Sequence, residues 1–423
     1  MMKPPRPDMS DWVLHFVHDR NSEFEITAQD LFGPDAPPIM PAHTESDIDR
    51  RFHDYHYAQL EHEDLEADAS AMCVLTKILD QGMIRSGWSF RSRKATIYGP
   101  KSAVCFTEMP LSSLVEYANT RGDSGKVAAY AIGLLKEELF AAGGRPVIYG
   151  LSGDHREVGD NRWPRFLAPE CGIGEQEQYR YVALSLEGNR RIDWTHEREW
   201  RWADHRNCIE VPGLPVWRKN DDIKFSRAFI LVRTEEEAQL VLSQLRRQCD
   251  AGNTNWDEPY DLELIKATRV VSLEQLTKAA LLGSNEILTI EQIPHHLVTL
   301  VPSVPATDAA KVFAAAVISE ALDASAAAAV EWRKGGDRDV AGFAEVVIED
   351  GLSDFTRAGL ELGLLKPLAG IHPFGSGGYW VDGVSRCCET QSIAEHEAAA
   401  KAAQKIIAKH LPELPSRIWT RWD

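Results

Sequence analysis

A short proline-rich segment, Val301-Pro-Ser-Val-Pro-Ala306, most constrains how this chain can fold. Each proline lacks the backbone donor that helices and sheets use, so neither element is expected to continue through it. The chain has 423 residues, which is too long for one ordinary core. We therefore expect a domain over 1–300 and a smaller accessory domain over 301–423, joined by this linker.

The composition is that of a soluble globular protein, with 44% hydrophobic and 26% charged residues. We see no run of about 18 apolar residues and no apolar signal core at the start, so we expect a cytoplasmic protein with no membrane partner. The 7 cysteines are scattered, which argues against a disulfide framework and a cysteine zinc site. A net charge of -18 argues against bulk attraction to nucleic acid, although it leaves a local basic patch open.

The first part of the chain alternates between strand and helix signals. Strands are predicted over 12–17 and 102–107, and an aromatic segment, partly of period two, predicts a strand over 192–202. Apolar residues three and four positions apart predict a helix over 71–82, with Gly82 as its stop. Residues 19–67 are rich in Pro, Asp, His and Glu, so they are predicted to be an insertion.

Beyond the linker, we predict Ala-rich helices over 309–330 and 393–411, two helical pieces within 345–365 and a hairpin over 379–390. This describes a mostly helical domain with a hairpin. Its Ala-rich faces can pack closely, so a homo-oligomer is a reasonable expectation. The hairpin and last helix faintly resemble the end of a double-stranded-RNA-binding domain. That module starts its last helix with lysines, whereas Glu395, His396 and Glu397 stand here, so we prefer an interaction or regulatory module.

Four short motifs follow one another along the first domain. They are His15-Phe16, Ile78-Leu79-x-x-Gly82, Phe106-Thr107-Glu108-x-Pro110-Leu111 and Glu197-x-Glu199-Trp200-Arg201. In this order they resemble AbiGi-type phage-resistance proteins. More distantly, the sequence is similar to the DarT group of DNA-modifying ADP-ribosyltransferases, over about residues 12–235. The resemblance implies an α+β fold, an ADP-ribosyltransferase-like split mixed β-sandwich with flanking helices, and NAD as the substrate.

The chemistry of ADP-ribose transfer fits these residue types. Cleavage between ribose and nicotinamide passes through an oxocarbenium-like state, which needs a carboxylate near the ribose. On a strand, Glu197 and Glu199 would face the same side. The resemblance gives Glu199 the ribose and Glu197 the acceptor. The further hypotheses concern dinucleotide binding: His15 at the adenosine ribose, Phe106 and Thr107 beside the nicotinamide, Tyr98 stacked on its ring, and Arg91 and Arg93 at the diphosphate.

Each residue also has a purely structural interpretation. Glu199 would be a strand carboxylate paired with Arg198 or Arg201, His15 and Tyr98 would be core residues, and Thr107 with Glu108 would cap a helix. Arg91 and Arg93 would lie on a solvated basic face.

We therefore expect a mono-ADP-ribosyltransferase that acts as a toxin or anti-phage defence effector. The resemblance favours DNA or RNA as its acceptor, and protein is the other option. The alternative is a non-catalytic, transferase-like binding protein or antitoxin of a two-component defence system, and a cognate antitoxin is a possible partner. A metal-dependent nuclease is a third hypothesis, although no compact metal motif supports it. The weak metal spacing at His53, His56, His62 and Glu63 also suits a solvated helix.

Overall fold

The computed structural model describes residues 10–20, 68–91, 94–111, 113–115, 129–153, 155–158, 165–186, 192–204, 212–254, 257–282, 293, 295–297, 305–335, 340–367 and 378–422. They contain both helices and strands, which confirms the α+β class. The chain divides into two compact units: Met1–Val241 with Glu263–Leu297, and Leu242–Leu262 with Val298–Asp423. The second unit thus begins beside the proline-rich segment and also takes in an earlier stretch of chain.

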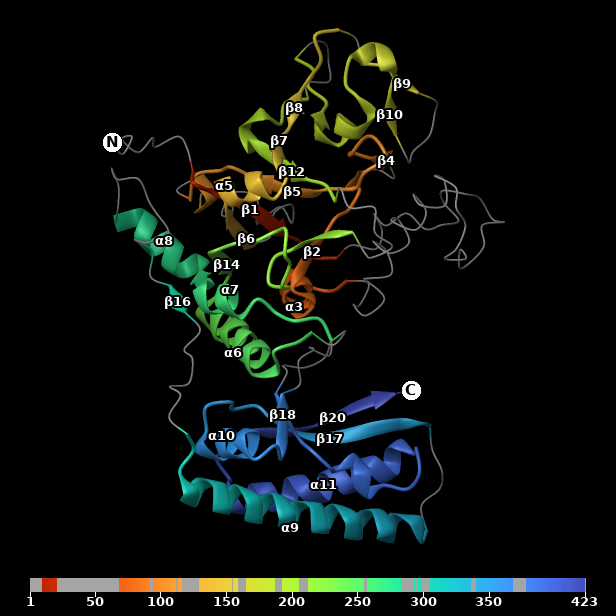
Figure 1. Ribbon diagram of the computed structural model, residues 1–423, viewed down its shortest axis with the longest axis vertical. Helices are drawn as coiled ribbons and strands as arrows, with labels where there is room; N and C mark the ends of the chain where they lie inside the picture. Colours follow the sequence, from red (N-terminus) through yellow and green to blue (C-terminus); the bar gives the residue numbers. More distant parts are fainter. Residues whose placement is uncertain are drawn as a thin grey trace. The chain divides into compact units, whose positions relative to one another are not determined.

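The first unit is built on an eight-stranded mixed sheet (Figure 1). Its β14 and β15 are parallel, and its other neighbouring pairs among the described strands are antiparallel. In spatial order the strands are β16 (His296–Leu297), β15 (Arg269–Ser272), β14 (Ala228–Val232), β6 (Tyr130–Leu135), β1 (Trp12–Val17), β5 (Val104–Thr107), β12 (Glu199–Trp202) and β7 (Arg145–Pro146).

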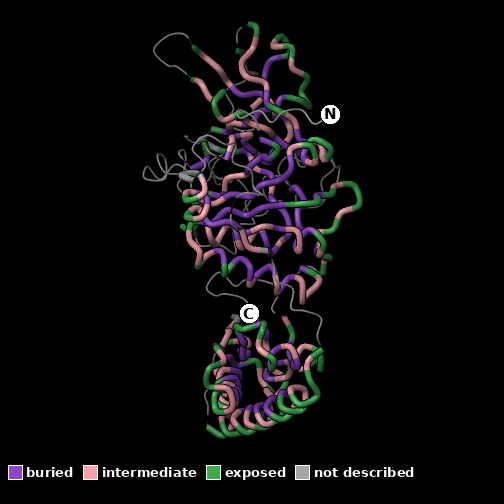
Figure 2. Tube along the Cα trace, turned by 90° about the vertical axis from the view of Figure 1, so that its left-hand side faces the viewer, coloured by how far each residue is buried: buried purple, intermediate pink, exposed green. Residues whose placement is uncertain are grey.

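Helices and two-stranded sheets surround this sheet. Buried residues, purple in Figure 2, run along the strands at the centre of the unit, where Trp12 packs edge-on against Phe229. The helices are α3 (Ala71–Gln81), α5 (Lys136–Ala141), α7 (Leu262–Ala267), α8 (Leu273–Leu282) and the start of α6 (Glu235–Ala251), whose residues from Leu242 on belong to the second unit. The short strands pair as β2 (Met83–Arg85) with β13 (Gly213–Pro215), β3 (Phe90–Arg91) with β4 (Lys94–Ala95), β9 (Glu157–Val158) with β10 (Phe166–Leu167), and β8 (Ile148–Tyr149) with β11 (Tyr181–Val182).

Helix α3 confirms the predicted helix over 71–82. Its N-cap is Ser70, whose hydroxyl accepts a hydrogen bond from the backbone of Cys73 at 3.4 Å. Gly82 ends the helix with a φ of 65°, and a Cβ there would lie 2.9 Å from the backbone nitrogen of Arg218. Glycine is therefore required both by the left-handed turn and by the close approach of the chain.

The predicted strand over 192–202 is wrong in its first half. Residues Thr195–Glu197 form the 3-10 helix η4, and Arg198 follows it with a φ of 46°. Strand β12 begins only at Glu199. The left-handed backbone of Arg198 interrupts the extended conformation, so strand alternation does not extend across it. Two further 3-10 helices, η2 (Pro169–Cys171) and η3 (Glu175–Arg180), precede β11.

The second unit packs its helices on a four-stranded antiparallel sheet. Its elements follow one another as α9 (Asp308–Arg333), β17 (Gly342–Ile348), α10 (Asp354–Glu361), β18 (Leu365–Pro367), β19 (Tyr379–Val381), η5 (Ser385–Cys387), α11 (Ile393–His410) and β20 (Ser416–Trp422). The spatial order is β18-β19-β17-β20. After α9, this β-α-β-β-α-β order is the split-βαβ arrangement of ferredoxin-like domains.

Several sequence predictions for this unit are corrected. The hairpin pairs β18 with β19, whereas the predicted second half of a hairpin over 379–390 contains η5. One of the two helical pieces predicted within 345–365 is instead part of β17, and β20 was not predicted. These strands pair over long sequence distances, as Glu345 does with Trp419, and such pairing leaves no local period to detect.

Helix α9 is, by length and composition alone, apolar enough to cross a membrane. The core helices of soluble proteins pass the same test. Here the helix packs along α11, and buried residues such as Val317 and Ile318 belong to the core of the unit.

Candidate functional site

Three neighbouring strands of the first sheet bring the predicted site residues together. Glu199 on β12 lies opposite Thr107 on β5, and Thr107 lies opposite Leu14, the neighbour of His15 on β1. All three strands line one cleft of about 1120 Å³. Of the predicted site residues, this cleft is lined by His15, Tyr98, Phe106, Thr107, Glu197 and Glu199.

The structure does not test the predicted roles of Arg91 and Arg93. The backbone of Arg91 belongs to β3, but its side chain and all of Arg93 lie outside the described residues. The predicted insertion after Arg20, with its histidines, lies outside them as well.

Glu199 is held at the start of β12 by its backbone and its side chain. Its N–H donates to the Tyr149 hydroxyl oxygen at 2.8 Å, and its carbonyl accepts from the Val147 N–H at 3.0 Å. Its carboxylate is 13% exposed and accepts from Arg201 Nε at 2.7 Å. The carboxylate therefore stands in the cleft in a fixed position.

Arg201 is the same-face neighbour of Glu199 on β12. It also lines the cleft, and its guanidinium donates to the carbonyl oxygens of Tyr179 and Tyr181. Burial disfavours the charged guanidinium, but the adjacent Glu199 carboxylate outweighs this effect and raises the pKa of Arg201. Arg201 thus remains a cation and orients one oxygen of Glu199.

Glu197 also lines the cleft, but it lies on a different element from the predicted strand. It belongs to η4 rather than to the strand, so it is not the strand-face partner of Glu199. The Thr107 hydroxyl donates to the Glu197 carbonyl, and the Glu108 N–H donates to the Arg198 carbonyl at 3.2 Å. Thr107, the last residue of β5, and Glu108, which follows it, therefore anchor the turn that carries Glu197.

These contacts also define the roles of Thr107 and Glu108. The Thr107 hydroxyl is used to hold the η4 turn. The Glu108 carboxylate accepts from Lys136 at 2.8 Å and from the Trp200 indole at 2.9 Å. Both residues thus support the wall of the cleft. Phe106, which precedes Thr107 on β5, is only 2% exposed.

His15 presents a neutral imidazole to the cleft. Its Nδ1 lies 2.9 Å from the Cys105 carbonyl oxygen, which can only accept, so Nδ1 carries the proton. Burial lowers the pKa of His15 to about 4. Near neutral pH, its Nε2 is therefore an acceptor, suited to a hydroxyl group rather than to a phosphate.

Tyr98 is a core residue at the cleft wall. Its side chain is 3% exposed, the Arg165 guanidinium lies 4.2 Å from its ring centroid, and its hydroxyl donates to Glu157 at 3.2 Å. Burial alone would raise the pKa of Glu157, but hydrogen bonds from Arg165 and His155 lower it to about 2. Since Arg165 already covers one ring face, the geometry does not favour a nicotinamide stacked there.

The sequence offered Arg198 or Arg201 as a structural partner of Glu199, and the structure shows the pairing with Arg201. Sequence reasoning missed other residues of the cleft. Trp194 and Arg85 also line the cleft, from the loop before η4 and from β2. Burial and the nearby Arg218 lower the pKa of Arg85 to about 9, which still leaves it a cation at neutral pH. No local pattern marks Arg85, because its position depends on the pairing of β2 with β13.

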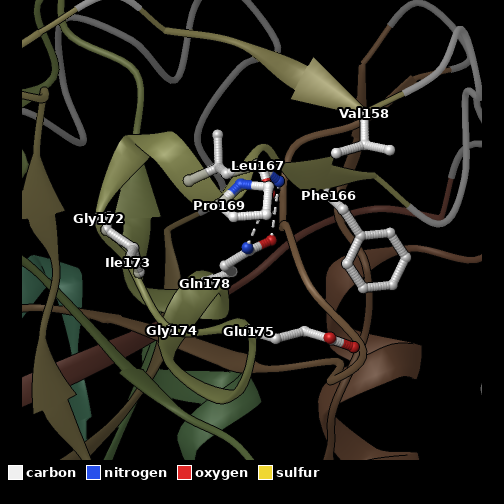
Figure 3. A pocket seen from close by; sticks show the side chains of 9 residues that line it. All are labelled: Val158, Phe166, Leu167, Pro169, Gly172, Ile173, Gly174, Glu175 and Gln178. Atoms are coloured by element: carbon white, nitrogen blue, oxygen red, sulfur yellow. Dashed lines mark hydrogen bonds between the residues drawn. The ribbon is translucent and has the colours of Figure 1, made fainter.

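A second cavity, of about 600 Å³, lies between β10 and η3 (Figure 3). Gln178 spans its floor, and its amide exchanges two hydrogen bonds with the backbone of Leu167, at 2.8 and 3.1 Å. The remaining wall is mostly apolar, with Phe166 and Val158 on one side and Glu175 as a charged side chain. This cavity thus offers a binding volume but no set of catalytic groups.

Within the described part of the chain, no three His, Cys, Asp or Glu side chains lie close enough to hold a metal ion. Comparison of the sequence with protein-family models and with curated proteins, and of the structure with solved structures, gave no match. The functional argument therefore depends on the geometry of the cleft.

Proposed function

We propose that the first unit is a mono-ADP-ribosyltransferase that uses NAD as its substrate. The observation that carries the proposal is the meeting of His15, Glu197 and Glu199 in one cleft, with Glu199 fixed by buried Arg201. The mixed sheet and its flanking helices are compatible with a variant of the split β-sandwich of such enzymes. The order of the four sequence motifs, which resembles AbiGi-type and DarT-like proteins, supports the same proposal.

In this proposal the bond between C1′ of the ribose and the nicotinamide nitrogen breaks, and nicotinamide leaves with the electron pair. Glu199 accepts a hydrogen bond from a hydroxyl of that ribose and stabilises the developing positive charge. Glu197 orients the acceptor and takes its proton as the new bond to C1′ forms. His15 Nε2 accepts from a hydroxyl of the adenosine ribose.

The diphosphate needs a cation, and Arg85 is a described cation of the cleft that fits this role. Arg91 and Arg93 remain candidates by their place in the sequence. The acceptor is a macromolecule, with nucleic acid favoured by the resemblance, and the biological role is that of a toxin or defence effector with a possible antitoxin partner.

The experiment is incubation of the full chain with NAD labelled in its adenylate half and a cell lysate. We expect a labelled macromolecule and free nicotinamide. Nuclease or protease digestion of the product then identifies the acceptor. Glu199→Gln should abolish labelling, whereas Glu137→Gln, at an exposed site on α5, should not. Full activity of Glu199→Gln would refute the residue assignment. Expression of the active chain should poison its host, and Glu199→Ala should relieve the poisoning.

One observation favours the non-catalytic alternative. The ion pair with Arg201 neutralises Glu199, as in a purely structural pair. In that case the cleft binds a ligand, or the chain neutralises a partner, without turnover. Neither NAD consumption nor labelling of any lysate component would then be observed.

A further inference from the structure

Helix α9 uses only one of its faces for the core of the second unit. That face packs against α10 and α11, and Figure 1 shows both of these helices on the same side of α9. The buried residues of the helix all lie on it: Ala314, Val317, Ile318, Ala321, Ser325 and Ala329. The opposite face of α9 is therefore left without a partner in the described part of the unit.

The opposite face of α9 has a regular spacing. Its residues follow one another in alternating steps of four and three, and all of them are exposed: Val312, Ala316, Ser319, Asp323, Ala326 and Val330. Because an α-helix has 3.6 residues per turn, these positions form one stripe along the helix. We call this stripe the outer seam. Steps of four and three are the spacing by which one helix packs along another.

The outer seam is more apolar than a solvated helix face usually is. Val312 is 71% exposed and Val330 is 48% exposed. The segment 312–330 contains no Lys or Arg, and Asp323 is the one charged residue of the seam. Charged side chains beside the seam form ion pairs within the chain: Lys311 with Glu361, and Glu320 with Lys409 and His410. A helix that is apolar on both faces is typical of a buried helix, so the seam is suited to a protein partner.

The residues of the outer seam are arranged symmetrically about Ala321. Matching positions on its two sides are Val312 with Val330, Ala316 with Ala326, and Ser319 with Asp323. If two copies of α9 packed antiparallel about this centre, each valine would meet a valine and each alanine an alanine. The Ser319 hydroxyl of one copy would donate to the Asp323 carboxylate of the other. A two-fold interface uses the same patch of both subunits, and this patch is complementary to itself.

Asp323 also distinguishes the two possible directions of packing. In a parallel pair, the two Asp323 carboxylates would lie side by side and repel each other. In the antiparallel pair they are four residues apart along the axis, which is about 6 Å, and each lies beside a hydroxyl.

We propose that the chain forms a homodimer in which the outer seam of α9 packs antiparallel against the same seam of a second copy. The composition of the seam favours this occupant over a membrane surface, because helices that lie on membranes usually carry Lys and Arg to meet anionic lipids. The proposal does not depend on the activity of the cleft in the first unit.

The size of the seam predicts a weak dimer. From Val312 to Val330 the helix spans about 27 Å, and a width of about 10 Å gives roughly 300 Å² for contact. Alanines in the seam let the two axes approach to about 8 Å, so the adjacent Phe313 can contribute to the contact. Stable complexes usually bury about 800 Å² per partner, so we expect a Kd on the order of 10 µM.

The first test is sedimentation equilibrium of the full chain up to about 300 µM, which is well above the expected Kd. Val312→Asp should weaken the dimer at least about tenfold, because it buries an unpaired charge at two symmetric places. Leu352→Asp is the matched control, since Leu352 is 47% exposed but lies in the turn before α10, and it should have no effect. Added salt should strengthen the dimer, because each chain carries a net charge of -18.

The second test determines the direction of packing. Under a mild added oxidant, a mixture of Val312→Cys and Val330→Cys chains should form a covalent dimer, with the native chain as the background. Neither variant alone should do so, because the two copies of one position are about 27 Å apart in the antiparallel pair.

Four results would overturn the proposal. They are a monomer at every concentration, a dimer that Val312→Asp leaves unchanged, covalent dimers of Val312→Cys alone, and a monomer that binds anionic lipid vesicles through the seam. The last result would assign the seam to a membrane surface. Glu199→Gln should dimerise normally, so a failure of the transferase proposal is distinguishable from a failure of this one.

Discussion

The Glu199–Arg201 ion pair should contribute measurably to both stability and turnover. The two charged groups meet at 2.7 Å, with side chains 5% exposed for Arg201 and 13% for Glu199. For charge centres about 4 Å apart at an effective dielectric constant of about 20, the attraction is about 4 kcal/mol. Burial of both charges opposes this gain, so we expect a net coupling free energy of about 2 kcal/mol.

A double-mutant cycle tests this value. Arg201→Met should lower the free energy of unfolding by about 3 kcal/mol, because it leaves a carboxylate without its buried cation. Glu199→Gln should cost about 1 kcal/mol, because the amide oxygen still accepts from Arg201. The double variant should be about 2 kcal/mol more stable than the sum of the single changes predicts, as measured by urea denaturation.

Turnover separates the roles of the two residues. If Glu199 touches the ribose, Glu199→Gln should lower kcat at least about a hundredfold. Arg201→Lys should lower kcat less than Arg201→Met and leave KM nearly unchanged, because it restores a cation that positions the carboxylate. A coupling free energy below about 0.5 kcal/mol, which is the usual limit for independent sites, would refute the reasoning.

Three further predictions concern the stability of the fold and the protonation of buried side chains. Gly82→Ala should lower the free energy of unfolding by more than Gly172→Ala. Both glycines have a positive φ, of 65° and 76°, but only a Cβ at Gly82 would meet another segment of the protein, at Arg218. Equal losses in denaturant titrations would contradict the packing argument. Burial raises the pKa of Glu345 from 4.5 to about 7, so the folded state should lose about 3 kcal/mol as the pH rises from 4 to 8. Glu345→Gln should abolish that loss in the pH dependence of unfolding, and an unchanged profile would be inconsistent with it. His15, with a pKa of about 4, should remain neutral from pH 5.5 to 8 with its proton on Nδ1, as read by nitrogen NMR shifts; protonation near pH 6.5 would disprove its burial.

Local sequence signals were sufficient for features that depend on neighbouring residues. The apolar spacing and Gly82 determine α3, because helix formation and left-handed capping act over a few residues. The strand at Trp12–Val17 is of the same kind. The order of short motifs also selected His15 and Glu199, which meet in the cleft.

Only the tertiary structure decided what surrounds those residues. The predicted pairing of Glu197 with Glu199 on one strand face failed, because Arg198 adopts a positive φ that alternation cannot reveal. The structure selects Arg201 rather than Arg198 as the partner of Glu199, and Arg165 covers Tyr98 through a contact between segments distant in sequence. In the second unit, the pairing of β17 with β19 and β20 joins segments that lie far apart in the sequence. Sequence periodicity reports which side of an element is buried, whereas register and long-range pairing determine which side chains meet.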